Sequence, residues 1–369
     1  MVSVEDVCRR VSQEIESKPM CEDIDSWLGC LSSMTSGGYI PLQYKPSFLK
    51  YQEAYFSDVY EEYRDHSLVL YRGEKPIGIW PLCIFRKLGG VPSFGTAGAA
   101  LMGPIFSQLP KAEAQRAVIE KILNTLFRIC KDVTKSKEAL HFQETILDSG
   151  MSQWGRKVLE HSATCEKVTW HAFTDLSLPW DGIQSQMRRT NKYSFEKGMD
   201  EFNIEIYDEK SPCIDKIFAE FHSLHRLVSG RETRGQKTWD IQKEAVSQGD
   251  DRVGKGFLVV IRDKVASKLA GAALFDTTQT TGLYCVAAYD RTRFAKPVGH
   301  IVQAAAMRRM QEYGLKWYEI GERAYPKDAG TNNKLVNIGL YKEGFATHLY
   351  PRVVWALDTE TFFSDEGDT

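Results

Sequence analysis

The sequence predicts an α/β chain of two domains, each a twisted mixed sheet flanked by helices, on three grounds. With 369 residues, 43% of them hydrophobic, the chain exceeds the size at which a single core usually stops growing. Short apolar runs bounded by turn residues, typical of strands, alternate with longer helical segments. One order of elements (strand, turn, strand, irregular segment, helix, strand) occurs in both halves of the chain.

The first copy of this order lies in the N-terminal half, after an amphipathic helix over residues 2–16 and a loop at 35–38. It begins with two strand-like runs joined by a short turn, which is the pattern of a hairpin. In chain order we expect a strand at 67–71, a turn at 72–76, a strand at 77–85, a Gly-rich loop from Gly95 to Gly103, a helix at about 111–130 and a strand at 139–146.

The second copy follows a basic helix that we expect over 183–197, ended by Gly198. Internal duplication explains the agreement better than chance. We therefore place a domain boundary near residue 165, giving domains over 1–165 and 166–369, and expect the acidic tail from Thr359 to fray. In chain order the second copy has strands at 257–262, 269–275 and 281–289, a helix at 298–313 and a strand at 317–320.

Charge and cysteine usage exclude several classes of protein. The 47 Lys and Arg residues against 49 Asp and Glu give a net charge of -2, so no global positive field is available to hold a nucleic-acid backbone. The eight cysteines form no C-x-x-C pair and no Cys/His cluster, which indicates reduced thiols and no metal site. No apolar run is long enough for a signal or a membrane span, so we expect a cytoplasmic protein without a membrane partner.

The second half also carries a series of motifs in a definite order. The first is a basic helix followed by a strand, and the last is a helix that contains Lys334 and Lys342. The motifs read, in order, QMRRTNKYSFEKGMDEFNIEIY, a strand pair containing Gly271, TGLYCVAAYD, LKWYEIG and NNKLVNIGLYKEGF.

Over residues 180–355 this series resembles the GNAT-related acyltransferase domain of the FemAB and peptidyltransferase-like families, where a Lys begins a helix that ends in an F-K-x-x-F-like signature. The resemblance implies two tandem GNAT-like domains, the first a degenerate copy inferred from the repeat alone, and N-acyl or aminoacyl transfer. The stretch 225–234 with Trp239 also resembles a subgroup that modifies sugars of bacterial surface glycans. That second resemblance implies an amino sugar, linked to a nucleotide, as acceptor.

The resemblance implies acetyl-CoA or another acyl-CoA as co-substrate, with one departure from the family pattern. GNAT enzymes carry a Q/R-x-x-G-x-G/A loop, and residues 293–300 keep only part of it. Pro297 and Gly299 suit the start of a helix whose free N–H groups attract an anion, and a lysine precedes them. We predict that Lys296, Val298, Gly299 and His300 bind the coenzyme.

Acyl transfer to an amine needs a proton acceptor, for which Glu319 is the first candidate. It alternates with Tyr318 along a strand, so a half-buried carboxylate with a raised pKa is expected, although a salt bridge to Arg323 or Lys316 explains it equally well. The other candidates stand near element ends. They are His225, which could instead be a satisfied helix histidine, Asp290 and His300.

Substrate contacts are expected from Arg231, Arg234 and Lys237 in the stretch ending at Trp239, since guanidinium groups bind diphosphates and carboxylates; solvated loop charges are the alternative. Lys334 is assigned to a phosphate or leaving group by the resemblance, and Lys342 to capping its helix. We predict Cys285 to be a buried structural thiol. Tyr284 and Tyr289 have opposite parity, which predicts opposite faces of one strand and leaves open which of them lines a cleft.

Three functions stay open. The first is an N-acyltransferase that moves an acyl group from a coenzyme A thioester to a small amino sugar. The second is an aminoacyl-tRNA-dependent transferase, in which the basic helix 183–197 would contact tRNA. The third is a scaffold that only binds a ligand or partner. The sequence leaves the acyl group, the acceptor and the oligomeric state open.

Overall fold

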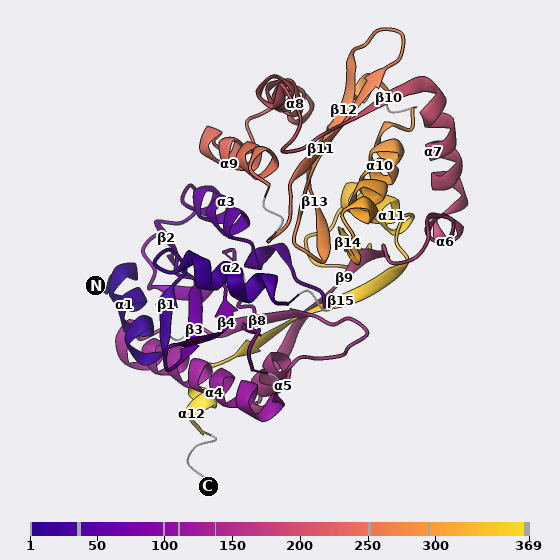
Figure 1. Ribbon diagram of the computed structural model, residues 1–369. Coiled ribbons are helices and arrows are strands. Elements are labelled where there is room, and N and C mark those ends of the chain that lie inside the picture. Colours follow the sequence, from indigo (N-terminus) through magenta and orange to yellow (C-terminus); the bar gives the residue numbers. More distant parts are fainter. Residues whose placement is uncertain are drawn as a thin grey trace. The chain divides into compact units, whose positions relative to one another are not determined.

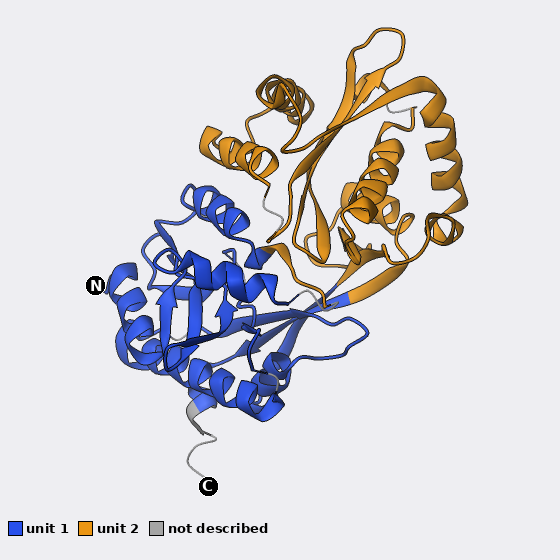
Figure 2. Cartoon of the chain, in the orientation of Figure 1, with its two compact units in different colours: residues 1–36, 43–169, 351–369 blue, residues 37–42, 170–350 orange. Residues whose placement is uncertain are grey.

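The computed structural model describes residues 2–34, 38–98, 100–109, 111–136, 138–249, 252–293 and 296–364, with the side chains of 361, 363 and 364 left out (Figure 1). Part of the expected loops at 35–38 and 95–103, and residues 294 and 295 of the coenzyme loop, lie outside these ranges. The chain divides into two compact units, coloured separately in Figure 2. Unit 1 comprises Met1–Ser36, Gln43–Thr169 and Pro351–Thr369, and unit 2 comprises Gly37–Leu42 and Trp170–Tyr350.

The units differ from the two continuous halves that the boundary near residue 165 implies. The C-terminal segment from Pro351 belongs to unit 1, because its apolar side chains Trp355, Leu357 and Phe362 are buried in the core of that unit. The tail that we expected to fray forms a helix up to Ser364, and the ring of Phe362 stacks on Phe127 with a centroid distance of 4.1 Å.

Unit 1 has small sheets packed against helices. Strands β1-β3-β4-β7 form one sheet and β2-β5-β6 another, while β8 pairs with the end of β15. Its elements are α1 (Val4–Glu14), β1 (Ser17–Pro19), α2 (Ile24–Ser32), α3 (Pro46–Phe56), β2 (Glu62–Asp65), β3 (Leu68–Arg72), β4 (Lys75–Trp80), β5 (Cys83–Arg86), β6 (Ser93–Gly95), β7 (Ile105–Phe106), α4 (Ala112–Arg128), β8 (Leu140–Thr145), α5 (Gln153–Glu160) and α12 (Thr359–Ser364). The short helical segments Leu42–Tyr44 and Ile129–Thr134 complete it.

Unit 2 is built on one sheet with strand order β10-β11-β12-β13-β14-β9-β15. Strands β9 (Thr164–Asp175) and β15 (His348–Leu357) each run from one unit into the other. The remaining elements are α6 (Trp180–Gln186), α7 (Arg189–Glu201), β10 (Phe202–Tyr207), α8 (Ile214–Ser229), α9 (Gln236–Ser247), β11 (Phe257–Asp263), β12 (Leu269–Thr277), β13 (Thr281–Tyr289), the short segment Arg291–Arg293, α10 (Val298–Glu312), β14 (Trp317–Arg323) and α11 (Asn333–Glu343).

Helices cover both faces of this sheet (Figure 1). The alternation of apolar side chains along β11 accounts for the two layers: Phe257, Val259 and Ile261 join the core under α10, whereas Leu258 and Val260 join the core under α8 and α9. Because every residue from Phe257 to Ile261 is buried, β11 is a central strand.

The expected basic helix is interrupted. Helix α6 ends at Gln186, Met187 is extended, and α7 starts at Arg189 and continues through Gly198. Gly198 is therefore not a helix end. A Cβ there would lie 2.4 Å from Ile301 Cδ1, so the glycine allows α7 to approach α10 closely.

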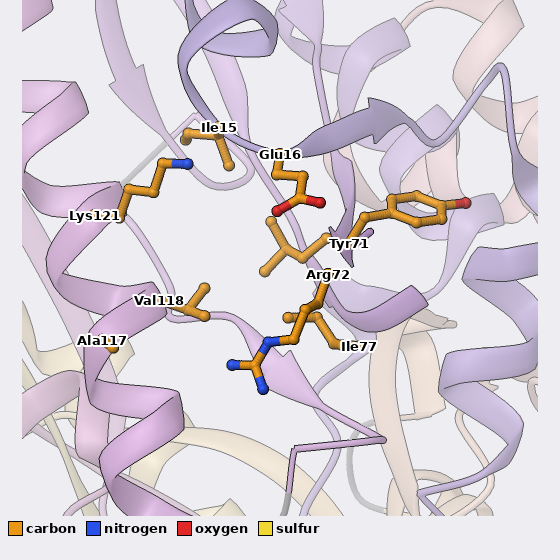
Figure 3. A pocket seen from close by; sticks show the side chains of 9 residues that line it. Ile15, Glu16, Tyr71, Arg72, Ile77, Ala117, Val118 and Lys121 are labelled. Carbon is orange, nitrogen blue, oxygen red and sulfur yellow. The ribbon is translucent and has the colours of Figure 1, made fainter. Parts of the chain in front are cut away.

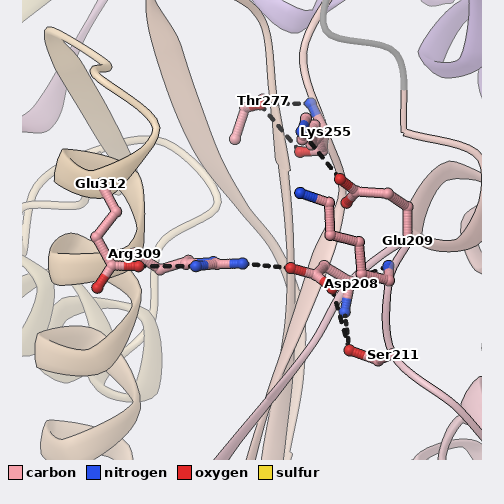
Figure 4. Close-up of polar contacts among 8 residues, drawn as sticks. Asp208, Glu209, Ser211, Lys255, Thr277, Arg309 and Glu312 are labelled. Atoms are coloured by element: carbon pink, nitrogen blue, oxygen red, sulfur yellow. Dashed lines mark hydrogen bonds and ion pairs between the residues drawn. The ribbon is translucent and has the colours of Figure 1, made fainter.

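A polar network fixes the C-terminal half of α10 to the rest of unit 2 (Figure 4). Arg309 donates to Asp208, which follows β10, and also to Glu312 at 2.8 Å. Close by, Lys255 forms an ion pair with Glu209 at 2.9 Å, and its backbone is hydrogen-bonded to the Thr277 hydroxyl. These contacts anchor the C-terminal end of α10. Because a helix is a rigid element, they also help to fix its N-terminal end.

We expect Trp355→Ala to destabilise the protein by about 3–5 kcal/mol, because this indole is only 2% exposed in the core of unit 1. Chemical denaturation followed by circular dichroism measures the loss. Trp170→Ala is the matched control, since that indole is 40% exposed and should cost much less. Equal losses from both substitutions would contradict the placement of the C-terminal segment in this core.

Candidate functional site

The sheet of unit 2 opens between β13 and β14. These strands run parallel and pair only at Thr281–Trp317, Gly282–Tyr318 and Leu283–Glu319. Beyond that point β14 is paired with β9, and β13 continues for six residues beside β12 alone. Backbone groups on one edge of β13 are thereby left without a neighbouring strand.

A bulge in β13 just past this opening changes the predicted orientation of two tyrosines. The register with β12 shifts between Leu274 and Phe275, so Cys285 is an extra residue in β13. The prediction that Tyr284 and Tyr289 face opposite sides is wrong for this reason. Both point to the α10 side, where their hydroxyl oxygens lie 2.9 Å apart.

A cavity of about 1010 Å³ occupies the opening. Its walls come from β13, from the segment that follows it, from the start of α10 and from one face of α11. Side chains from both faces of β13 reach it, since Cys285 and Val286 belong to the core under α8 whereas Tyr284 and Tyr289 belong to the core under α10. The lining includes Val228, Tyr284, Cys285, Val286, Ala287, Tyr289, Asp290, Arg291, Arg293, Lys296, Val298, Gly299, His300, Lys334, Asn337, Ile338, Tyr341 and Lys342.

The N-terminus of α10 opens into this cavity. Pro297 is the N-cap residue and supplies no side-chain cap, so the N–H groups of Val298 and Gly299 are available to a ligand. A Cβ at position 299 would lie 2.8 Å from the Tyr341 hydroxyl, which explains why glycine stands there. Free N–H groups together with the helix dipole favour an anion at this end.

Apart from Lys342, four lysine and arginine side chains line the cavity, and two of them are already engaged in ion pairs. Arg293 pairs with Asp263 and Asp290, and Lys296 pairs with Glu201 at 2.6 Å. The other two, Arg291 and Lys334, are exposed and form no ion pair within the described ranges.

The phenols of the cavity are protonated at neutral pH. Burial raises the pKa of Tyr284 to about 12 and moves that of Tyr289 and Tyr341 well above its ordinary value. They can therefore donate hydrogen bonds to a ligand. Asp290, in contrast, accepts from the backbone and hydroxyl of Thr292, which lowers the pKa of its carboxyl and makes it a weak base.

The His300 imidazole lies in the first turn of α10 and lines the cavity. Burial lowers its pKa from 6.5, so the ring is neutral at physiological pH and has a nitrogen able to accept a proton. It packs edge-on against Tyr341 with a centroid distance of 5.3 Å, and no described side chain forms a hydrogen bond with it.

Lys342 is a cavity residue rather than the helix cap that we expected. Its ammonium packs against Gly321 of β14, where a Cβ would lie 2.7 Å from Nζ, and Gly321 has a positive φ of 117°. Burial lowers the pKa of Lys342, while the charges of Glu319 and Glu322 oppose that shift. None of the described residues forms a hydrogen bond or an ion pair with it. In the sequence, the Tyr-Lys-Glu-Gly-Phe stretch at 341–345, which fits the F-K-x-x-F-like signature, is the signal that could have identified Lys342 as a site residue.

Glu319 lies at the last residue pair before the strands diverge and does not line the cavity. Its carboxylate lies 2.9 Å from His171 Nδ1 and accepts from the Tyr39 hydroxyl at 2.6 Å. Tyr318 is buried as well, so this strand has no solvent side, contrary to the alternation that we assumed. Arg323, one expected partner, is paired with Glu343.

The predicted residues of α8 and α9 form a separate cluster outside the cavity lining. Arg234 lies over the Trp239 ring at 5.0 Å and donates to Gln242 at 3.1 Å. His225 packs on the same indole with a centroid distance of 5.0 Å, and burial lowers its pKa. Arg231 is exposed. Only Val228 of this region reaches the cavity.

Unit 1 has a smaller pocket of about 150 Å³ between β3, β4 and α4 (Figure 3). Apolar side chains, among them Ile15, Ile77 and Val118, form its floor. Glu16 at its edge already accepts from the backbone of Gly73 at 2.5 Å. The space holds a group of only a few atoms, which makes the cavity of unit 2 the better candidate for a site.

No family model matches the chain, and no curated protein matches it in sequence. Among solved structures, the chain is similar to FemX, with 12% identity, 100% of this chain and 99% of that chain covered, and a TM-score of 0.63. It is also similar to the C-terminal domain of a putative lysylphosphatidylglycerol synthetase from Agrobacterium fabrum, with 10% identity, coverage of 94% and 95%, and a TM-score of 0.52.

A conserved protein of unknown function from Bacteroides thetaiotaomicron is similar at 10% identity, with coverage of 97% and 98% and a TM-score of 0.51. At such identities these similarities concern the fold. The predicted fold class is confirmed: the chain has an α/β fold of two tandem GNAT-like domains, similar to FemX over its full length. No helix in the described ranges is long and apolar enough to cross a membrane.

Proposed function

We propose that unit 2 is an N-acyltransferase that moves an acyl group from a coenzyme A thioester to the amine of a small acceptor. The observation that carries the proposal is the cavity in the opening between β13 and β14, which joins the uncapped start of α10 to the exposed backbone edge of β13. The proposal places a phosphate group and a reacting carbonyl at these two positions.

The donor would be held at its phosphates. The N–H groups of Val298 and Gly299 and the dipole of α10 attract an anion, and Arg291 and Lys334 add positive charge at the same side of the cavity. A volume of about 1010 Å³ accommodates a long, flexible donor as well as an acceptor.

The acyl oxygen would be held by the backbone of β13. Asp290 N–H donates to Ala270 O at 2.9 Å, toward β12. By the alternation of an antiparallel pair, the N–H groups of Ala287 and Tyr289 then point away from β12, toward the side that β14 has left. Such fixed donors, with the Lys342 ammonium nearby, stabilise the negative charge that develops on the carbonyl oxygen.

Proton transfer would use groups of the same cavity. The amine attacks the thioester carbon, the neutral His300 imidazole accepts the amine proton, and the carbon–sulfur bond breaks. The protonated imidazole then gives this proton to the leaving thiolate, to which the phenol of Tyr284 or Tyr289 can donate a hydrogen bond. Asp290 is a poorer acceptor because of its lowered pKa, and Glu319 and His225 lie outside the lining.

The acceptor that we propose is an amino sugar, nucleotide-linked, of bacterial glycan synthesis. The support is the sequence stretch 225–234, whose Val228 lines the cavity at the end of α8. Arg231 and Arg234, which follow this end of α8, would then contribute to binding the acceptor. An absence of turnover would favour the hypothesis that the protein is a scaffold that binds a ligand without catalysing a reaction.

A second candidate is aminoacyl-tRNA-dependent transfer. It is favoured by the full-length similarity to FemX and by the exposed basic side chains Arg188, Arg189 and Lys192 near the start of α7. Both donors carry phosphates and an activated carbonyl. Transfer of radiolabelled amino acid from charged tRNA, with binding that weakens steeply as salt rises, would identify the second.

Incubation with acetyl-CoA or longer acyl-CoA and a panel of amino sugars is expected to release free thiol, detected with a chromogenic disulfide. Lys342→Met should lower kcat/KM about 100-fold, because it removes a charge near the carbonyl oxygen. Lys334→Ala should raise the donor KM about tenfold with kcat retained.

Lys216→Ala is the matched control, since this lysine is exposed on α8 and outside the cavity lining. It should behave as the unaltered protein. Thiol release that is absent with every donor and acceptor, or equal losses in all three variants, would contradict the proposal.

We expect His300 to titrate below pH 6.5, with the signal followed by ¹⁵N–¹H correlation spectra and assigned by its loss in His300→Gln. If the imidazole accepts the amine proton, kcat/KM falls as the pH decreases through this pKa. The unfolded chain binds this proton near pH 6.5 and the folded chain only at lower pH, so the free energy of unfolding also decreases as pH falls below 6.5. A His300 pKa above 6.5 would exclude this role.

A further inference from the structure

Glu319 carries a buried, hydrogen-bonded carboxyl group at the point where β13 and β14 separate. Glu319 is 6% exposed and belongs to the last pair between β13 and β14. His171 Nδ1 lies 2.9 Å from one oxygen of this carboxyl group, and the Tyr39 hydroxyl donates to the other at 2.6 Å. Contacts on both oxygens hold the group in one orientation.

Tyr39 reaches Glu319 on a short segment that is docked to unit 2. The backbone N–H of Ile40 donates to Thr280 Oγ1 at 3.2 Å, and the Thr278 hydroxyl donates to Ile40 O at 2.9 Å. The Tyr39 ring packs edge-on against Phe173, with a centroid distance of 5.5 Å. His171 belongs to the neighbouring strand β9, so two segments other than β14 contact this carboxyl group.

The Lys342 ammonium lies on the cavity side of the same strand. The register of β14 against β9 shifts between Glu319 and Gly321, and the ammonium occupies the space that a side chain at 321 would fill. Within the part of the chain that the structure describes, no group accepts a hydrogen bond from this ammonium or forms an ion pair with it. Its surroundings therefore combine burial, which disfavours a charged lysine, with one fixed carboxylate of opposite sign.

We propose that Glu319, oriented by His171 and Tyr39, is a positioning residue that keeps the Lys342 ammonium charged inside the cavity. The inference rests on the proposed function, in which this cation stabilises the developing oxyanion. Glu319 thus acts through Lys342 and not as the proton acceptor. The charge of Glu319 opposes the fall of the Lys342 pKa more than that of Glu322 does.

Other charges bear on Lys342 as well. Glu322, on the same strand, is exposed, so water screens its effect more than that of Glu319. Glu343, the next residue of α11, is paired with Arg323. The ionisable groups that line the same cavity are Tyr284, Tyr289, Asp290, Arg291, Arg293, Lys296, His300, Lys334 and Tyr341.

The test compares Glu319→Gln with Glu322→Gln, since both substitutions remove one carboxylate from β14 and only one of these carboxylates is buried. Lysine amines are dimethylated with ¹³C, and the Lys342 signal, assigned by its loss in Lys342→Arg, is titrated by NMR. We expect Glu319→Gln to lower the Lys342 pKa by about one unit or more. Glu322→Gln should lower it by much less.

Turnover supplies a second measurement. The basic limb of the kcat profile should move to lower pH by the same interval in Glu319→Gln, while the donor KM at low pH is retained. Tyr39→Phe, which removes one donor and no charge, should produce a smaller shift in the same direction. Because this variant keeps the carboxylate and the ring, it also serves if Glu319→Gln does not fold, as judged by circular dichroism.

A Lys342 pKa that is unchanged in folded Glu319→Gln, or changed equally by Glu322→Gln, would overturn the proposal. The NMR titration requires no turnover. A shifted Lys342 signal in a protein without acyl transfer would therefore support the pairing and refute only the proposed function.

Discussion

The divergence of β13 from β14 is the constraint on which the rest of the site depends. After three residue pairs the two parallel strands exchange no further hydrogen bonds, because β14 follows β9 and β13 follows β12. Each strand carries a bulge just past the separation, at Cys285 and between Glu319 and Gly321. A gap of this kind leaves backbone N–H and C=O groups on the edge of β13 without a partner strand. The cavity in the gap lets a ligand reach these groups.

The surroundings of the gap combine burial with a few placed charges. The phenols of Tyr284, Tyr289 and Tyr341 are kept protonated by desolvation, and the imidazole of His300 is kept neutral by the same effect. Lys342 differs from these groups, since desolvation lowers the pKa of its ammonium while the charges of Glu319 and Glu322 oppose that shift. The helix start at Val298 contributes partial positive charge that does not titrate. An acyl donor with phosphates matches this arrangement of donors.

Local pattern was sufficient for most elements. The strands at 257–262 and 281–289 and the helix at 298–313 agree with β11, β13 and α10 to within one residue, because apolar periodicity and turn residues determine them locally. The start of α10 could also be derived from Pro297 and Gly299 alone. What could not be derived depended on distant contacts, such as the return of Trp355 to the first core.

The site shows the same division. Parity along β13 assigned Tyr284 and Tyr289 to opposite faces, and a single bulged residue, which no local signal announces, placed them together. Glu319 was recognised as a half-buried carboxylate, but its partners His171 and Tyr39 come from segments 148 and 280 residues away in the chain. The capping role was expected because Lys342 lies near a helix end. Its amine instead occupies the space left by the missing side chain of Gly321, on the distant strand β14.

The discontinuity of unit 1 has a consequence for the order in which the protein can form. Both segments of unit 2, Gly37–Leu42 and Trp170–Tyr350, lie between segments of unit 1 along the chain, and all of their residues precede Pro351. During synthesis the ribosome therefore delivers every residue of unit 2 before Trp355 and Phe362, which complete the core of unit 1. Unit 1, which contains the N-terminus, is therefore the last unit to be completed. Until the end of synthesis its core lacks these two buried aromatic side chains.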